Sequence, residues 1–377
     1  MSKKILILNS KPHFNHGGIE TYSTHLINFF LEKKYKVFEI SQLPEKNFLE
    51  DFDENFYFIY HDFYNKSKLN KKKYSYFLTY FKLFWISVKV NKLAKKIIKK
   101  YNIDVVIDNN FATYITFVKN VKYIWVQHYD WNIIRGKKII SFLRKILFVK
   151  NRLLYPNIVV YSSFDKEFLI KYKLINQTKT NIFDIFPGFF LDNKKNQNID
   201  LSSKTQVAYL GRLDDKQKNI NFLKKIVDKA ELKKINMKID VYGEGPDRYL
   251  LENNKNIILH GSYDRNNIES IFRKIKILLL PSTYEGLGLV VVEALINGTP
   301  CIISNSYLNA GYLINDSRGK LLNKHDNEDI WIEEIGKFLN LSENEYFYFF
   351  NNCINFSKNN LNFEKFKNNW IDLIDSI

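Results

Sequence analysis

Short apolar runs alternate along this chain with longer segments in which apolar and polar residues recur at helical spacing. Uninterrupted apolar runs of four to six residues are typical of strands buried on both faces of a parallel sheet. A first set of strands is predicted at residues 5–9, 37–40, 56–60, 105–108, 123–126 and 158–161. A second set is predicted at residues 207–210, 239–242, 257–259, 277–280 and 301–304. The alternation predicts an α/β fold with two parallel sheets.

The length of 377 residues predicts two domains, each large enough for a core of its own. Residues 192–204 are polar and rich in Asn, Lys and Ser, which is typical of a linker. We therefore place a first domain at residues 1–190 and a second at residues 191–362. The remaining segment, 363–377, has the pattern of a helix.

Two carboxylates eight positions apart, Glu285 and Glu293, bracket a Gly-x-Gly turn between the strand at 275–280 and a helix predicted at 289–297. The first turn of a helix presents free N–H groups, which favour an anion. Glu285 in the turn and Glu293 on the helix are placed to accept hydrogen bonds from hydroxyls. The alternative is a solvated Glu285 and a Glu293 on the helix surface, and spacing alone does not decide between the two.

A second cluster of glycines and cations lies upstream. Gly211 and Arg212 follow a predicted strand, and Lys218 precedes a helix predicted at 220–234. Arg212 has the geometry to grip a phosphate with two hydrogen bonds, and Lys218 adds a point charge. Gly243 and Gly245 follow the next strand. The alternative is that both cations are surface residues paired with Asp214 or Asp215; the ordered set of motifs favours the phosphate site.

This ordered set resembles the retaining glycosyltransferases of family 4, in which two Rossmann-like domains face a central cleft in the GT-B architecture. The resemblance runs from Gly17 and Gly18, through His128, to residues 319–322. It implies the GT-B fold, with the C-terminal helix crossing back to the first domain. It also implies transfer of a hexose from a nucleotide diphosphate sugar, most commonly UDP-linked, to a glycan or lipid-linked glycan of lipopolysaccharide, capsule or wall polymer.

By this resemblance Arg212 and Lys218 hold the donor diphosphate, Glu285 contacts the donor sugar and Glu293 takes the ribose diol. Backbone contacts to the donor are implied for Gly17, Gly18, Gly211, Gly243, Gly245, Gly286, Leu287, Gly288 and Leu289. His128 is implied to lie near the reacting sugar, so the candidate catalytic residues are Glu285, His128, Arg212 and Lys218. The acceptor is expected near Gly18, His128 and Asp130.

Two positions depart from the family pattern. Tyr312 falls near the place of a usual Glu, and Pro187-Gly188 replaces the Asn-Gly ahead of the linker. The first change puts donor contacts at Tyr312 in doubt. Neither change affects the phosphate grip or the pair of glutamates.

All of the formal net charge of +17 lies in the predicted first domain, where residues 1–190 carry 32 Lys and Arg against 15 Asp and Glu. Residues 66–103 hold twelve lysines and no acid, and residues 131–164 are also acid-free. Basic amphipathic helices suit an anionic bilayer, where each cation near the surface contributes about 1 kcal/mol. The alternative is that the apolar stripe packs into the domain and the lysines are its solvated face.

We expect an anionic membrane surface as a partner, and a cytoplasmic protein held peripherally at the inner face of the cell membrane. Cys301 and Cys353 are expected to be reduced structural thiols. The seven histidines show no metal-ligand spacing, so we expect no metal and no cofactor. Nucleic-acid binding is disfavoured because the chain carries no recognisable nucleic-acid module. A basic α/β protein that binds nucleic acid, or binds sugar nucleotides without catalysis, stays as the alternative.

Overall fold

The computed structural model describes residues 2–14, 18–42, 53–63, 76–110, 116–128, 155–172, 175, 179–188, 200–264, 267–323 and 326–377, with the backbone alone at 76–83. The chain divides into two compact units. The described residues as far as Pro187, together with Lys367–Ile377, form the first unit. Gly188–Phe366 belongs to the second. The divisions at 187/188 and 366/367 lie three and four residues from the predicted boundaries.

The first unit is built on a parallel sheet of seven strands in the order β3-β2-β1-β4-β5-β6-β7. Its strands are β1 (Lys4–Leu8), β2 (Lys36–Gln42), β3 (Phe56–His61), β4 (Val105–Asp108), β5 (Lys122–Val126), β6 (Asn157–Val160) and β7 (Asn181–Asp184). Six of them were predicted. The edge strand β7 was not, because it is short and its end residues are exposed, so it lacks the apolar run of a buried strand.

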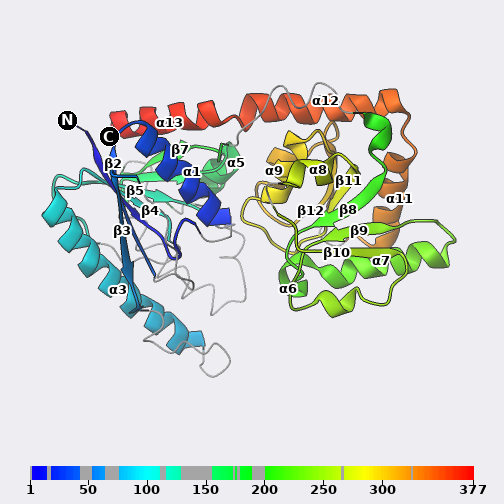
Figure 1. Cartoon of the computed structure of the whole chain (residues 1–377), viewed down its shortest axis with the longest axis horizontal. Helices are drawn as coiled ribbons and strands as arrows, with labels where there is room; N and C mark the ends of the chain where they lie inside the picture. Colours follow the sequence, from blue (N-terminus) through cyan, green and yellow to red (C-terminus); the bar gives the residue numbers. More distant parts are fainter. Residues whose placement is uncertain are drawn as a thin grey trace. The chain divides into compact units, whose positions relative to one another are not determined.

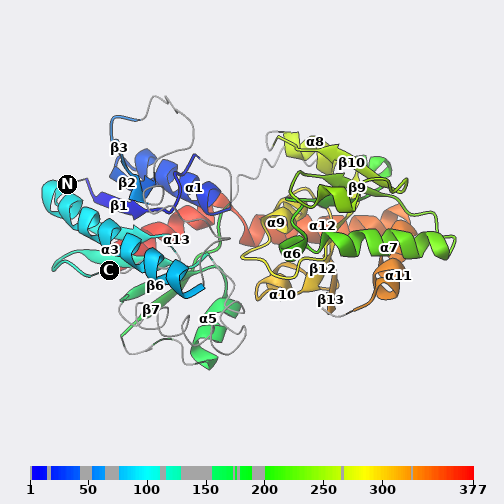
Figure 2. The ribbon, with the colours of Figure 1, turned by 90° about the horizontal axis from the view of Figure 1, so that it is seen from below.

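Helices α1 (Gly18–Glu32) and α13 (Phe363–Ser376) lie on one face of this sheet, and α3 (Tyr76–Tyr101) lies on the other (Figures 1 and 2). A shorter helix, α5 (Ser163–Lys171), follows β6. The ring of Trp370 from α13 packs edge-on against Phe30 of α1, with centroids 6.0 Å apart. Lys367 forms an ion pair with Glu32 at 2.9 Å. These contacts confirm that the C-terminal helix returns to the first domain.

The second unit contains a parallel sheet of six strands in the order β10-β9-β8-β11-β12-β13. Its strands are β8 (Gln206–Leu210), β9 (Ile239–Tyr242), β10 (Ile257–Gly261), β11 (Ile275–Leu280), β12 (Cys301–Asn305) and β13 (Gly319–Asn323). Five were predicted. The edge strand β13 was missed because only two of its five residues are buried.

Helices cover both faces of the second sheet (Figure 1). On one face α7 (Ile220–Leu232) packs against α11 (Glu328–Leu339), with the rings of Phe222 and Trp331 5.7 Å apart. On the other, α9 (Leu289–Ile296) packs against α12 (Glu343–Asn360). The short helices are α6 (Asp215–Lys218), η3 (Leu201–Ser203), η4 (Arg248–Leu250), α8 (Ile268–Phe272) and α10 (Ala310–Leu313).

Each sheet has one place where neighbouring strands send their connections in opposite directions. In the first sheet that place lies between β1 and β4, and in the second it lies between β8 and β11. In open parallel sheets the loops diverge there and leave a crevice at the carboxyl ends of the strands, where ligands bind. The segments that follow these four strands are therefore the candidate ligand-binding segments.

Lys204, just ahead of β8, is a lysine inside the core of the second unit, with 2% of its surface exposed. Its ammonium donates to the carbonyl oxygens of Phe272 (2.7 Å) and Ile275 (3.3 Å) and to Oγ1 of Thr299 (3.0 Å). Burial lowers the pKa of Lys204 from 10.5 to about 7. The nearby Cys353 and Cys301 are free, buried thiols, and burial raises the pKa of Cys353 to about 12.

We predict that Lys204 makes the stability of this protein depend on pH. Between about pH 7 and 10.5 the unfolded chain holds a proton at Lys204 that the folded chain gives up, so the free energy of unfolding rises with pH across that window. The Lys204→Met variant has no titrating group at position 204. The measurement is urea unfolding of both proteins from pH 7 to 10. The difference in unfolding free energy, wild type minus variant, should increase with pH; a constant difference would show that Lys204 titrates normally.

Candidate functional site

The loops after β8 and β9 approach each other so closely that only glycine fits at two positions, and a third glycine is favoured by its backbone conformation. A Cβ on Gly243 would lie 1.9 Å from the carbonyl oxygen of Gly211, and one on Gly245 would lie 2.2 Å from that of Leu213. Gly211 and Gly243 also have φ values of 150° and 148°. Hydrogen bonds join the two loops, from Gly211 N–H to Tyr242 and from Leu213 N–H to Glu244. The packing of these loops alone therefore requires Gly243 and Gly245.

Lys218 and Glu285, predicted from separate motifs, form an ion pair with 2.5 Å between Nζ and Oε1. Lys218 ends α6, the short helix that follows β8, and Glu285 lies in the loop after β11, so the pair lies where the connections of the two strands diverge. Glu285 is only 6% exposed, and Ser282 donates its hydroxyl proton to the same Oε1 at 2.6 Å. The alternative of a solvated Glu285 is wrong.

Hydrogen bonds fasten the Glu285 loop to α6, the short helix that ends at Lys218. Thr283 donates its N–H to the carbonyl oxygen of Gln217 at 2.8 Å and its hydroxyl proton to the carbonyl oxygens of Lys216 and Gln217. Asn219 donates from Nδ2 to the carbonyl of Pro281 at 3.3 Å. Asn219 has φ +54°, a left-handed conformation that separates α6 from α7. These bonds fix Lys218 opposite Glu285.

Arg212 lies on the exposed side of this cluster. Its guanidinium donates to Oδ2 of Asp214 at 2.6 Å and to Oε1 of Gln217 at 3.3 Å, and 61% of its side chain is exposed. Burial raises the pKa of Tyr284; the carboxylate of Asp214 raises it further, the charge of Arg212 lowers it and Glu285 raises it. Tyr284 therefore lies within electrostatic range of the groups from both motifs. One alternative from the sequence was that Arg212 is a surface cation paired with Asp214 or Asp215. The structure has Arg212 exposed and paired with Asp214.

Helix α9 begins beside the ion pair. Gly288 caps it with φ +75°, and a Cβ there would lie 2.6 Å from the hydroxyl oxygen of Tyr307. Gly286, Leu287 and Leu289 surround this cap, where the N–H groups of a first helical turn are available to an anion. Glu293 is half-buried further along α9.

The structure explains one of the two departures from the family pattern and, at the other, the glycine that this chain shares with the family. Tyr312 in α10 packs edge-on against Phe356 of α12, with centroids 5.6 Å apart, so its ring is a packing residue within the second unit. A Cβ on Gly188 would lie 2.5 Å from Cβ of Phe366 and 2.8 Å from Cα of Phe363. Glycine at position 188 therefore lets the chain pass the start of α13.

In the first unit His128 is buried and bonded through both ring nitrogens. Asn109 uses Nδ2 to donate to other residues, so its Oδ1 accepts from Nε2 of His128 at 3.1 Å. Nδ1 of His128 then accepts the hydroxyl proton of Tyr161. Burial lowers the pKa of His128 to about 3, so the imidazole is neutral at physiological pH. A donor sugar would have to replace one of these partners to contact the ring.

The hydrogen bonds of His128 continue into a buried polar network at the carboxyl ends of β1 and β4. Asn109 donates to Oδ1 of Asn9 at 2.9 Å, and Asn9 donates to Oε1 of Glu39 at 2.7 Å. Glu39 is fully buried, and its Oε2 lies 2.6 Å from Nδ1 of His13. Sequence reasoning missed this network. Its signal was a Glu inside the apolar run of β2 and an Asn directly after β1 and after β4.

Some predicted positions fall outside the described residues, namely Gly17, Asp130, residues 66–75 of the first basic window and most of the second window, 131–164. Gly18 is the first residue of α1 and is exposed. In the parts of the chain that the structure describes, no three His, Cys, Asp or Glu side chains are grouped to hold a metal ion. Over the same residues, no helix combines the length and the apolarity needed to span a bilayer.

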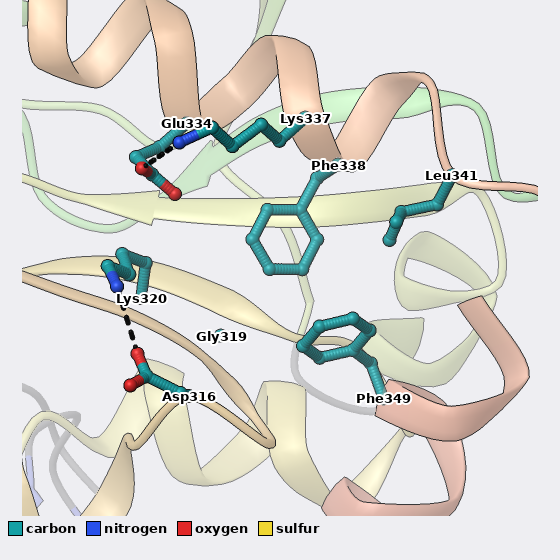
Figure 3. Close-up of a pocket in the computed structure, with 8 residues that line it drawn as sticks. All are labelled: Asp316, Gly319, Lys320, Glu334, Lys337, Phe338, Leu341 and Phe349. Carbon is teal, nitrogen blue, oxygen red and sulfur yellow. Dashed lines mark hydrogen bonds and ion pairs between the residues drawn. The ribbon is translucent and has the colours of Figure 1, made fainter. Parts of the chain in front are cut away.

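A pocket of about 200 Å³ lies at the amino end of β13, between this strand, α11 and α12. Phe338, Leu341 and Phe349 line its interior, and the cations at its rim are paired, Lys320 with Asp316 and Lys337 with Glu334 (Figure 3). The strands are parallel, so this pocket lies at the opposite end of the sheet from Glu285. It contains none of the predicted site residues.

Comparison with known proteins indicates a glycosyltransferase. The family model described as glycosyl transferases group 1 matches residues 192–352, the region that holds the Lys218–Glu285 pair. An uncharacterized glycosyltransferase of Haemophilus influenzae is 26% identical over 337 residues, 86% of each chain. The sequence comparisons thus support a glycosyltransferase.

Two further relatives match over shorter stretches. An uncharacterized 41.2 kDa protein in the cps region of Klebsiella pneumoniae is 26% identical over 188 residues, so the chain spans about half the length of that relative. A Campylobacter jejuni enzyme is 33% identical over 138 residues, 36% of this chain and 38% of the enzyme. Its name describes an alpha-1,4-N-acetyl-D-galactosaminyltransferase acting on an undecaprenol-diphosphate-linked saccharide.

Solved structures show the fold. Sucrose-phosphate synthase from Thermosynechococcus elongatus superposes with a TM-score of 0.77 at 14% identity, covering 99% of this chain and 98% of that one. WaaG, a glycosyltransferase involved in lipopolysaccharide biosynthesis, superposes with a TM-score of 0.71 at 14% identity, covering 98% and 99%. Both are GT-B glycosyltransferases. The predicted GT-B fold, with two Rossmann-like domains, is confirmed.

We predict that Gly288→Ala destabilises the second unit, because a Cβ would meet Tyr307 and a left-handed non-glycine residue costs roughly 1–3 kcal/mol. Adding Tyr307→Phe should recover part of the loss by removing the hydroxyl. The matched control is Gly336→Ala in α11, where a Cβ meets nothing within 4 Å and alanine should stabilise by about 1 kcal/mol. Urea unfolding of all four proteins gives the comparison, and equal effects at the two glycines would contradict it.

Proposed function

We propose that this protein is a metal-independent, anomer-retaining family 4 glycosyltransferase that moves a hexose from a nucleotide diphosphate sugar, with UDP as the carrier. The acceptor is a glycan or lipid-linked glycan used in cell-surface polysaccharide synthesis. The observation that carries the proposal is the buried Lys218–Glu285 pair at the carboxyl ends of β8 and β11, within the region that the family model matches. In this pair, Lys218 is the cation proposed to bind the diphosphate and Glu285 is the carboxylate proposed to bind the sugar.

The donor is proposed to bind along the second unit. Lys218 and Arg212 take the diphosphate, aided by the N–H groups at the start of α9. Glu285 accepts hydrogen bonds from the sugar hydroxyls, and Glu293 from the ribose diol. Fixed cations of this kind stabilise the charge that develops on the leaving diphosphate, which usually contributes most to such transfers.

The proposed transfer proceeds on one face of the sugar. The bond between the anomeric carbon and the diphosphate oxygen breaks while the acceptor oxygen bonds to the same face. The departing phosphate oxygen takes the acceptor proton, so no separate base is needed. His128 is proposed to position the sugar as a neutral imidazole, since burial lowers its pKa to about 3.

The proposal for the acceptor is based on two of the relatives. One lies in a cps region, and the name of another describes transfer to an undecaprenol-diphosphate-linked saccharide. We propose by this likeness that the acceptor here is a saccharide carried on a lipid diphosphate.

A screen of nucleotide sugars against lipid-linked saccharides tests the function. One sugar nucleotide should be consumed with transfer, the product should keep the anomeric configuration of the donor by NMR, and activity should persist in excess EDTA. Lys218→Ala should lower turnover about 10²–10³-fold, measured below the melting temperature of the variant, because the change also leaves the buried Glu285 without its cation. Loss of activity in EDTA that magnesium or manganese restores would contradict metal independence, and no turnover of any nucleotide sugar would contradict the activity.

Helix α3 carries the described part of the basic surface. Ile86, Val90, Ala94 and Ile98 are buried, so its apolar face packs into the first unit, as the alternative interpretation of the sequence stated. The outer face presents Lys89, Lys92, Lys96, Lys99, Lys100 and the half-exposed Trp85. None of these lysines forms an ion pair with a residue in the described parts of the chain. We propose that this outer face holds the protein electrostatically at an anionic membrane.

Charge reversal on α3 should release the protein from anionic vesicles. The variant changes Lys92, Lys96 and Lys99 to Glu, and the matched control changes three exposed lysines of the second unit, Lys238, Lys274 and Lys358. Flotation with phosphatidylglycerol vesicles should fall for the first variant, stay for the control and weaken with salt, because the Debye length shrinks from about 10 Å at 0.1 M to about 3 Å at 1 M. Equal flotation of both variants would contradict membrane attachment through α3 and would show that its lysines are only a solvated face.

A further inference from the structure

Each cation that is proposed to hold the donor diphosphate is bonded in this structure to a carboxylate of the same chain. Lys218 is bonded to Glu285 and Arg212 to Asp214, at 2.5 and 2.6 Å. The two pairs differ in exposure. The side chains of Lys218 and Glu285 are 14% and 8% exposed, against 61% and 25% for Arg212 and Asp214. Water screens the second pair but hardly screens the first.

A phosphate that binds Lys218 therefore competes with Glu285 for the ammonium. Once Lys218 turns to a phosphate, the buried Glu285 carboxylate keeps only the hydroxyl of Ser282 among the partners described here. A buried carboxylate without its cation is unfavourable. The hydroxyls of a donor sugar are hydrogen-bond donors that can replace the ammonium at Glu285, whereas a bare nucleoside diphosphate brings none to it.

We propose that the Lys218–Glu285 pair makes the second unit select a sugar-bearing nucleotide over a bare nucleoside diphosphate. This rests on the proposed function, since it takes the diphosphate to bind at Lys218 and the sugar at Glu285. A sugar nucleotide satisfies both partners when it separates them. The nucleoside diphosphate left after transfer satisfies only Lys218, so Glu285 reclaims the ammonium and expels the product.

Calorimetric titration with UDP and with inorganic pyrophosphate, which lacks a base, tests the exchange. Glu285→Gln removes the competing charge but keeps the size of the side chain. It should tighten binding of both probes on the order of tenfold. It should also reduce or reverse the preference for the sugar nucleotide found in the donor screen over UDP. Unchanged or weaker binding of the two probes would overturn the proposal.

Two further variants separate this exchange from a general effect of removing negative charge. Asp214→Asn makes the same chemical change at the exposed pair and should tighten UDP binding no more than about threefold. In a Lys218→Met background, Glu285→Gln should no longer tighten UDP binding, because no ammonium is left to compete for. An equal gain with and without Lys218, or at Asp214 and Glu285 alike, would show that charge alone is responsible.

Glu285→Asp covers the case in which Glu285→Gln does not fold, which thermal unfolding would reveal. It keeps the charge but withdraws the carboxylate by one methylene, so UDP binding should still tighten, by less than with Gln; unchanged binding would again overturn the proposal. Wild-type binding distinguishes a failure of the proposed function from a failure of the exchange at Glu285. Wild-type protein that binds neither UDP nor pyrophosphate would remove both ideas, whereas wild-type binding that Lys218→Met weakens supports the diphosphate assignment whatever Glu285 does.

Discussion

Two neighbouring parallel strands whose connections leave in opposite directions determine where polar side chains can gather in each unit of this protein. Elsewhere the interior strands are covered on both faces by helices and carry apolar runs. Where the connections diverge, between β1 and β4 and between β8 and β11, the loops leave room for side chains from distant parts of the sequence. Asn9 meets Asn109 in the first unit, and Lys218 meets Glu285 in the second.

The two clusters are chemically different although the topology that creates them is the same. In the second unit, opposite charges lie on the two sides of the junction, so the site is an ion pair that an anion can open. In the first unit, amides and a neutral imidazole lie at the junction, and the carboxyl group of Glu39 contacts Asn9 and His13. A neutral, fully bonded network suits the positioning of a ligand better than the binding of its charge.

The sequence was a good guide to the buried strands and to the charged groups of the second unit. Apolar runs located every interior strand, and the spacing of Arg212, Lys218 and Glu285 located one cluster. It failed where the physical signal was weak or depended on the fold. The edge strands β7 and β13 carry too few buried residues to form a pattern. The bonds of His128 come from Asn109 and Tyr161, which only the order of β4, β5 and β6 brings together. The glycines at 211, 243 and 245 were predicted for donor contact, whereas the structure gives them a packing role as well.

The return of α13 to the first unit has a consequence for how the chain folds during synthesis. Trp370 is fully buried against α1, and residues 367–377 belong to the first unit although they follow the whole of the second. Domains usually fold from the N-terminus as they leave the ribosome. Here the first unit stays incomplete while the second unit emerges and folds. During that time the surface of α1 that Trp370 covers is exposed to water. The domain that is made first is thus the one that is completed last.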